Sequence, residues 1–224
     1  MSFSLLIKIR NLPGYQIQEQ FNSIDILRYF LEMNLQEFDN SVEKYAEMDD
    51  LWYEKNNENL ELHMLEIARR THNYITVFYS LLGRTRRFRD KLGENSFKLE
   101  YENKIKENFG DIESLLVKNL REYFQHYDVP PIKVEIIVQS LGYEKDKKIV
   151  LLDSTKLLEY ERLNAKLKKY ISENKIDLLD LIHKHNLKLK EFYKWFNATI
   201  YERYRKELEE LKQYEKEYIR SMQH

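Results

Sequence analysis

The chain has 224 residues, of which 42% are hydrophobic and 33% are charged, a balance typical of a globular protein rather than a disordered one. It contains no cysteine, which excludes disulfide bonds and thiolate metal sites, and its net charge of −1 argues against coating nucleic acid through charge alone. The first apolar run is too short for a signal peptide and no run approaches the length of a membrane span, so we expect a cytoplasmic protein without a membrane partner.

Only 5 glycines and 3 prolines occur, and so few helix-breaking residues favour long helices. Residues 3–9 alternate weakly and are expected to form a short strand or arm, followed by a turn at Pro13-Gly14. Apolar residues then recur at spacings of three and four from Phe21 to Trp52, which predicts one long helix that stops near Asn56.

A second long helix is predicted from Leu60 to Leu82, with Gly83 ending or loosening it. Gly93 marks a turn, and residues 96–108 have the pattern of a more polar helix. The basic residues that follow Gly83 therefore lie at or beyond the expected end of the second helix.

The next helix is expected to begin at Gly110-Asp111 and to end before Pro130-Pro131, because proline cannot donate a helical hydrogen bond. Strand-like alternation over 132–138, followed by a second apolar run at 149–152, predicts a β-hairpin. Asp153-Ser154 then has the character of a helix N-cap.

The C-terminal part of the chain is again periodic. One helix is predicted through Leu157 and Ile171, and a long helical stretch runs from Leu178 to Leu211. The highly charged end, from Glu207 to Arg220, is expected to project as a coiled arm.

No shift in composition marks a linker between domains. We therefore predict a single, predominantly helical domain over residues 1–224. Within it, the β-hairpin is an insertion at 132–152 and the C-terminal helices occupy 154–224.

The clearest chemical pattern is the pair Arg121 and, five residues later, His126. Both lie on an apolar-periodic helix, close to its expected C-terminal end and just before the two prolines. Arginine is suited to binding a phosphate, and imidazole is suited to acid–base catalysis near neutral pH. The spacing alone is common in proteins, so the position at a helix end gives the pair its weight.

This segment resembles the Arg-x4–6-His signature of HEPN domains, which occur in toxin–antitoxin pairs, abortive-infection proteins and RNA-guided CRISPR effectors that cut RNA. The resemblance covers residues 18–130, in which two long helices precede the helix with the motif. It implies an all-α, HEPN-like helical bundle as the core of the chain. In the family the residue after the arginine is commonly Asn, Asp or His, whereas here it is Glu122.

The resemblance implies a metal-independent endoribonuclease of phage defence or a toxin–antitoxin system that uses no cofactor. His126 would act as general acid or base on the ribose 2′-hydroxyl or the leaving oxygen. Arg121 would bind the scissile phosphate and stabilise charge in the transition state. RNA would be the substrate, a 2′,3′-cyclic phosphate and a 5′-hydroxyl the products, and an antitoxin or another regulator a further partner.

Helix geometry sets a condition on this site. Five residues at about 100° each place Arg121 and His126 roughly 140° apart around a straight helix. They converge only if the helix deforms or if a second subunit completes the site. HEPN-like proteins commonly pair two motif helices across a dimer axis, so the resemblance implies a homodimer with a composite active site.

Weaker candidates for substrate binding lie on the second long helix. They are Arg69, Arg70, His72, Asn73, Arg84, Arg86 and Arg87. The family often places a polar residue of this helix near the motif, and the arginine cluster could hold RNA phosphates while Phe88 stacks on a base. The simpler interpretation is a solvated polar face with ordinary surface cations. His183 and His185 are two residues apart, so they point apart on a helix and no shared metal site is expected.

Two alternatives to the nuclease stay open. Glu122 and the near-neutral net charge favour a non-catalytic interaction or scaffold protein that keeps the HEPN-like bundle. The other alternative is a helical scaffold unrelated to that family. In both, Arg121 pairs with a surface carboxylate and His126 caps the end of its helix.

Overall fold

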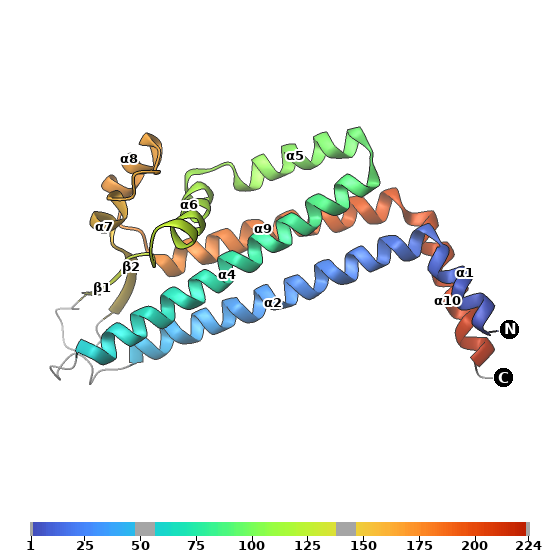
Figure 1. Cartoon of the computed structure of the whole chain (residues 1–224), viewed down its shortest axis with the longest axis horizontal. Coiled ribbons are helices and arrows are strands. Elements are labelled where there is room, and N and C mark those ends of the chain that lie inside the picture. Colours follow the sequence, from blue (N-terminus) through green and yellow to red (C-terminus); the bar gives the residue numbers. More distant parts are fainter. Residues whose placement is uncertain (1, 48–56, 138–146, 223–224) are drawn as a thin grey trace.

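The computed structural model describes residues 2–47, 57–137 and 147–222 and shows a mostly helical chain with one small hairpin (Figure 1). The helices are α1 (Ser2–Asn11), α2 (Pro13–Glu47), α4 (Asn57–Leu92), α5 (Asn95–Phe109), α6 (Ile112–His126), α7 (Ser154–Leu158), α8 (Ala165–Glu173), α9 (Leu178–Arg203) and α10 (Arg205–Met222). The strands β1 (Ile132–Ile137) and β2 (Lys147–Leu152) pair antiparallel, with Ile132 opposite Leu152. The prediction of a helical chain with an inserted hairpin is confirmed, although Val138 and Gly142 lie outside the described residues.

The long helices α2 and α4 lie side by side along the molecule, and α5 and α9 run along the same bundle (Figure 1). At one end, α1 and α10 pack together beside both termini, whereas α6, α7, α8 and the hairpin lie at the opposite end. Within residues 2–47, 57–137 and 147–222, no helix is both long and apolar enough to cross a membrane.

Buried side chains seven residues apart explain why α2 and α4 pair over their whole length. In α2 these are Ile17, Ile24, Leu31 and Phe38, and in α4 they are Ile67, Tyr74, Leu81 and Phe88. A seven-residue repeat keeps one face of each helix toward the core along its whole length. Each such side chain contributes about 1.5–3 kcal/mol when buried, and all eight belong to the single hydrophobic core cluster of the described residues.

The N-terminal strand or arm predicted over residues 3–9 is wrong, because this segment is the helix α1. Ile9 is buried, and the ammonium of Lys8 lies 4.3 Å from the ring centroid of Tyr214 on α10. Packing against α10 stabilises α1 as a helix, and the weak apolar pattern of residues 3–9 does not indicate this contact. Pro13 begins α2 instead of forming a longer turn, since proline is tolerated at the first helical position.

The predicted boundaries of the long helices need two corrections. Helix α2 ends at Glu47, and Trp52 and Asn56 lie outside the described residues. Helix α4 continues through Gly83 to Leu92, so this glycine neither ends nor breaks the helix. The predicted turn at Gly93 is confirmed by its φ of 72°.

The C-terminal part is divided more finely than its sequence pattern indicates. The single helix predicted through Leu157 and Ile171 is two helices, α7 and α8, and a carboxylate oxygen of Asp153 accepts the backbone N–H of Thr155 at the start of α7. The charged end is the helix α10, which buries Leu208 and Leu211 and extends beside α1 beyond the end of the bundle (Figure 1).

Candidate functional site

Helix α6 presents both residues of the Arg-x4-His motif. It begins after Asp111, whose Oδ1 accepts the backbone N–H of Ser114 at 2.8 Å as an N-cap. It continues to His126, and the next residue, Tyr127, leaves the helical conformation while its N–H still donates to the Tyr123 carbonyl at 2.9 Å. Because α6 is helical throughout Ile112–His126, the directions of its side chains follow ordinary helix geometry.

Arg121 points from α6 toward α4. Its guanidinium lies 4.7 Å from the ring centroid of Tyr79, a cation–π contact. Burial raises the pKa of Tyr79, and the positive charge of Arg121 opposes that rise. Within the described part of the chain Arg121 forms no ion pair, so the surface carboxylate expected in the scaffold alternatives is not its partner here.

His126 is the last helical residue of α6 and its side chain is exposed. The end of the helix is closed by the backbone N–H of Tyr127 and not by the imidazole. On a regular helix the side chains of Arg121 and His126 are roughly 140° apart. One chain therefore does not place the two candidate catalytic groups on a common face.

Two arginines that were expected to bind substrate are held by acidic residues. Arg69 donates two hydrogen bonds of 2.6 Å to the carboxylate of Glu66. Arg70 donates to the same carboxylate at 2.7 Å and forms an ion pair with Glu37 on α2. These carboxylates compete with a phosphate for the same donors.

His72 lies close to the motif helix. Its ring centroid is 4.8 Å from that of Phe124 on α6, and its Nε2 is 3.4 Å from the hydroxyl of Thr76. The neighbouring Asn73 is half-buried on the same helix. Of the weaker candidates, His72 thus contacts α6 directly.

The four arginines after Gly83 do not form one basic patch. Arg84 donates to the hydroxyl of Ser23 on α2 at 2.8 Å, and Arg87 is exposed. Arg89 pairs with acidic residues and lies with its guanidinium 4.7 Å from the ring centroid of Tyr101. Arg86 faces a cavity beside α6. Successive turns of α4 direct these side chains to different neighbours, so the clustered sequence does not become a clustered surface.

The expectation that Phe88 stacks on a base is wrong, because only 1% of this residue is exposed. Its ring packs edge-on against Phe21 and Phe196, with centroid separations of 5.7 and 6.0 Å. Phe88 belongs to the buried series of α4 spaced seven residues apart, so its side chain points into the core and not toward solvent.

A cavity of about 520 Å³ lies between α4, α5, α6 and α9. It is lined by Phe78, Tyr79, Leu82, Gly83, Arg86, Ile105, Phe109, Ser114, Leu115, Lys118, Arg121 and His185. Arg86 and Lys118 are exposed and Arg121 is half-buried, so three cations surround its opening. No acidic residue is among these lining residues. We call this feature the α6 cavity, and its opening the cationic rim.

The floor of the α6 cavity is buried and uncharged. His185 on α9 is 2% exposed, and its Nδ1 lies 3.2 Å from the Tyr74 hydroxyl. Burial lowers the pKa of His185 to about 3, so the imidazole is neutral at physiological pH. The ring also packs against Phe78, with centroids 4.2 Å apart. His183, two residues earlier, instead contacts Asp39 on α2 at 2.8 Å.

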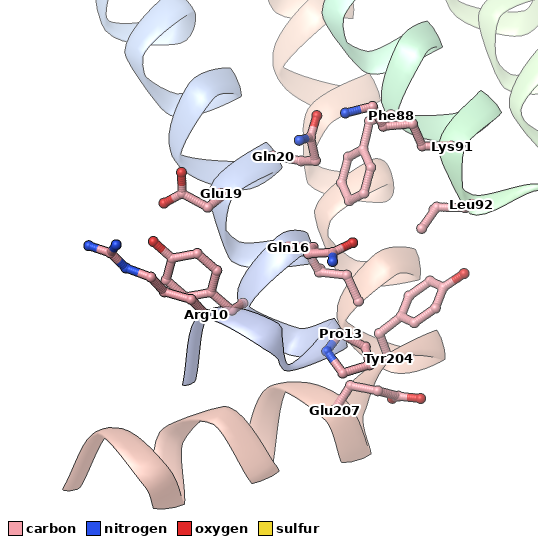
Figure 2. A pocket seen from close by; sticks show the side chains of 12 residues that line it. Arg10, Pro13, Gln16, Glu19, Gln20, Phe88, Lys91, Leu92, Tyr204 and Glu207 are labelled. Carbon is pink, nitrogen blue, oxygen red and sulfur yellow. The ribbon is translucent and has the colours of Figure 1, made fainter. Parts of the chain in front are cut away.

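A second pocket of about 460 Å³ lies where α1, α2, α4 and α10 meet. Figure 2 shows Arg10 and Glu19 on one side of this pocket and Lys91 and Tyr204 on the other, with Glu207 below them. Both basic and acidic side chains line this pocket, so its charge favours neither an anionic nor a cationic ligand. The α6 cavity is therefore the more specific candidate.

Of the residues that line the α6 cavity, sequence reasoning names only Arg86 and Arg121 as site residues, and those it misses include Lys118, Ser114, Gly83 and His185. The one local signal is Gly83, a glycine within an otherwise helical pattern, which by itself predicts a helix end. His185 comes from a helix distant in sequence, and no local pattern indicates that it lies beside Arg121.

Comparison with known proteins yields no match for this chain among family models, curated proteins or solved structures. Among the described residues, no group of three or more His, Asp or Glu side chains could hold a metal ion. Helix α6 and the cavity beside it are therefore the features from which a function is proposed.

Proposed function

We propose that this chain is a metal-independent endoribonuclease of the HEPN type, with Arg121 and His126 as its catalytic residues. The observation that supports this most directly is the environment of the Arg121 guanidinium. Its guanidinium has no carboxylate partner within the described residues and shares a cavity rim with Arg86 and Lys118. Three cations without a carboxylate attract a phosphate, and binding the scissile phosphate is the role assigned to Arg121.

In the proposed reaction a general base removes the proton of the ribose 2′-hydroxyl, and the 2′ oxygen attacks the adjacent phosphorus. The bond from phosphorus to the 5′ oxygen breaks, and that oxygen takes a proton from a general acid. The exposed imidazole of His126 serves as one of these groups, a role that typically contributes about 10²–10⁴-fold to the rate. Arg121 stabilises the charge that develops on the phosphate oxygens.

The divergence of the two side chains on α6 implies that a second copy of the chain completes the site. A phosphate held by Arg121 of one copy would meet His126 of the other. Helix α2 offers an apolar face that a second copy could cover, because Ile26, Tyr29, Phe30 and Met33 are exposed at helical spacing. A location in the cytoplasm and a role in phage defence or a toxin–antitoxin pair, with an antitoxin as regulator, belong to the same proposal.

The test is cleavage of a mixed RNA pool in EDTA by wild type, R121A and H126A. We expect wild type alone to cut, leaving 2′,3′-cyclic phosphate and 5′-hydroxyl ends. The matched control is H183A, which removes another exposed histidine on a different helix and should cut like wild type. Cleavage by H126A at the wild-type rate would refute the proposal.

Mixing the two inactive variants tests the composite site. If Arg121 and His126 act across the dimer, half of randomly mixed dimers contain one intact site out of two, and about one quarter of wild-type activity returns. If both residues act within one chain, mixing restores nothing. This result separates a composite site from a deformation of α6.

A second candidate function is a non-catalytic helical interaction protein. The observation that favours it is the regularity of α6, which keeps Arg121 and His126 on different faces. This candidate predicts that wild type, R121A and H126A are equally inactive on RNA, and that mixing the variants restores no activity.

A further inference from the structure

We propose that the groove between β1 and α4 binds an extended, basic segment of another protein, which adds to the hairpin as a third strand. The groove has a volume of about 540 Å³ and is lined by residues within 60–68 of α4 and within 128–134. We call it the β1 groove. It shares no lining residue with the α6 cavity, and neither Arg121 nor His126 lines it, so the inference does not depend on RNA cleavage.

The outer edge of β1 carries backbone groups that β2 does not use. The Pro131 carbonyl accepts the backbone N–H of Asp153 at 2.8 Å, and in the same register Ile132 lies opposite Leu152. Successive residues of an antiparallel strand direct their N–H and C=O groups to opposite edges, so Ile132 and Val134 direct theirs away from β2. Within the described residues these groups make no other backbone hydrogen bond. Such an edge is a template for a further strand.

The β1 groove runs along this open edge. Neighbouring residues of a strand point their side chains to opposite faces of a sheet. The groove nevertheless contacts Ile132, Lys133 and Val134 in succession, and no residue of β2 is among its described lining residues. It therefore follows the edge of β1 and does not cross one face of the hairpin. The other edge of the sheet is already covered, since the N–H of Leu152 donates to the Ile176 carbonyl at 3.0 Å.

Helix α4 forms the opposite wall of the groove with apolar side chains. Met64, Leu65 and Ala68 line it, and Leu65 is 54% exposed. On the side of the strand, Val129 is 46% exposed. Covering this surface with apolar side chains of a partner is favourable. A strand edge that faces a helix across an apolar groove suits one extended chain, because its backbone pairs with the edge and its alternate side chains enter the groove.

The charge of the lining selects a basic partner. Glu61 and Asp128 line the groove and are exposed, and within the described residues neither forms an ion pair. Lys133 is the one cation among the described lining residues, and its ammonium already lies 3.4 Å from the Glu135 carboxylate. The two carboxylates therefore attract a lysine or arginine of the partner and repel an acidic segment.

A second copy of this chain fits the groove less well than a single strand does. The free edge of a second copy is again β1, and β2 accompanies that strand on its other side. Neighbouring strands lie about 4.8 Å apart, so the accompanying β2 would meet α4. The occupant is therefore a segment that is extended and unpaired on both edges before it binds.

The experiment is selection of random short peptides, displayed on phage, against the full chain. Binding of the enriched peptides is then measured by fluorescence anisotropy. We expect apolar residues at alternate positions and at least one lysine or arginine. Failure to enrich any peptide would overturn the proposal, as would peptides without this alternation. Enrichment of acidic peptides would overturn the role of Glu61 and Asp128.

Methylation of the peptide backbone tests strand addition directly. Methyl groups on every second amide remove the donors along one edge of the bound peptide. One of the two alternating sets faces β1 and should weaken binding at least tenfold, whereas the other set should have little effect. Equal effects of the two sets would contradict pairing with β1.

Matched variants locate the groove. L65D should weaken binding at least tenfold, whereas L62D, which changes another exposed leucine of α4 outside the groove lining, should leave it unchanged. E61Q should weaken the basic peptides, and E32Q, at an exposed glutamate of α2, should not. Equal losses within either pair would show non-specific attraction and contradict the inference.

The variant H126A separates this inference from the proposed function. It should bind the peptide like wild type even where it no longer cuts RNA. RNA cleavage by a chain that binds no peptide would refute this inference and leave the nuclease standing, and peptide binding without cleavage would do the reverse. A loss of dimer in sedimentation of L65D, without any enriched peptide, would identify a second copy as the occupant and overturn the assignment to another protein.

Discussion

The buried His185 predicts that the protein loses stability in mild acid. In the folded chain, burial lowers the pKa of His185 to about 3, with the charge of Lys188 adding to the effect and that of Asp111 opposing it. In the unfolded chain the same imidazole titrates near 6.5. Below pH 6.5 the unfolded state therefore binds more protons than the folded state, and the free energy of unfolding must fall as the pH drops toward 3.

The magnitude follows from the size of this shift. Each pH unit below 6.5 removes about 1.4 kcal/mol until the folded pKa of about 3 is reached. Between pH 8 and pH 5 the contribution of His185 is therefore a loss of about 2 kcal/mol. The window stops at pH 5 because most carboxylates titrate below it.

The assay is urea unfolding followed by circular dichroism at pH 8, 7, 6 and 5, for wild type and H185Q. Glutamine retains a polar group that can pair with the Tyr74 hydroxyl but does not titrate, so the variant should lose about 2 kcal/mol less than wild type over this range. The control H126Q removes an exposed histidine that takes part in no ion pair among the described residues, and it shows how much of the wild-type profile is specific to His185. Parallel profiles for wild type and H185Q would refute the reasoning that burial holds this imidazole neutral.

Substitutions at four further positions test the packing described above and the proposed dimer. G14A should lower the free energy of unfolding by about 2–3 kcal/mol, because its Cβ would lie 2.1 Å from the backbone oxygen of Glu207, whereas G83A should raise it by about 0.5–1 kcal/mol. The opposite order in urea unfolding would contradict the close contact between α2 and α10. D111A should cost about 1–2 kcal/mol through loss of the α6 N-cap, and D111N, which keeps the cap, should recover most of it. F30E should convert the proposed dimer to a monomer in sedimentation, and an unchanged dimer would exclude this face of α2.

Local periodicity was sufficient to predict most helices. The regular apolar spacing in α2 and α4 places enough buried side chains on one face to determine a helix in any packed structure. The weak pattern of α1 was not sufficient, because its helical state depends on contacts with α10 from the other end of the chain. The helix end predicted at Gly83 is wrong for a related reason, since the packing of α4 on both sides of it outweighs its low helix propensity.

The candidate site was predicted only in part. The sequence places Arg121 and His126 on one helix, and rigid helix geometry alone predicts their divergence. It does not reveal that Arg121 lines one cavity together with Arg86, Lys118 and Ser114. That arrangement requires the packing of α4, α5 and α9 around α6.

The sequence by itself determined the helical class, the hairpin and the position of the motif on its helix, because these depend on interactions between residues close in the chain. Only the tertiary structure decided which cations stay unpaired, which aromatic rings are buried and which histidine becomes neutral. Phe88 and His185 illustrate the difference, since each owes its environment to helices distant in sequence. Burial and charge pairing are properties of the packed chain, and they emerge only when those helices meet.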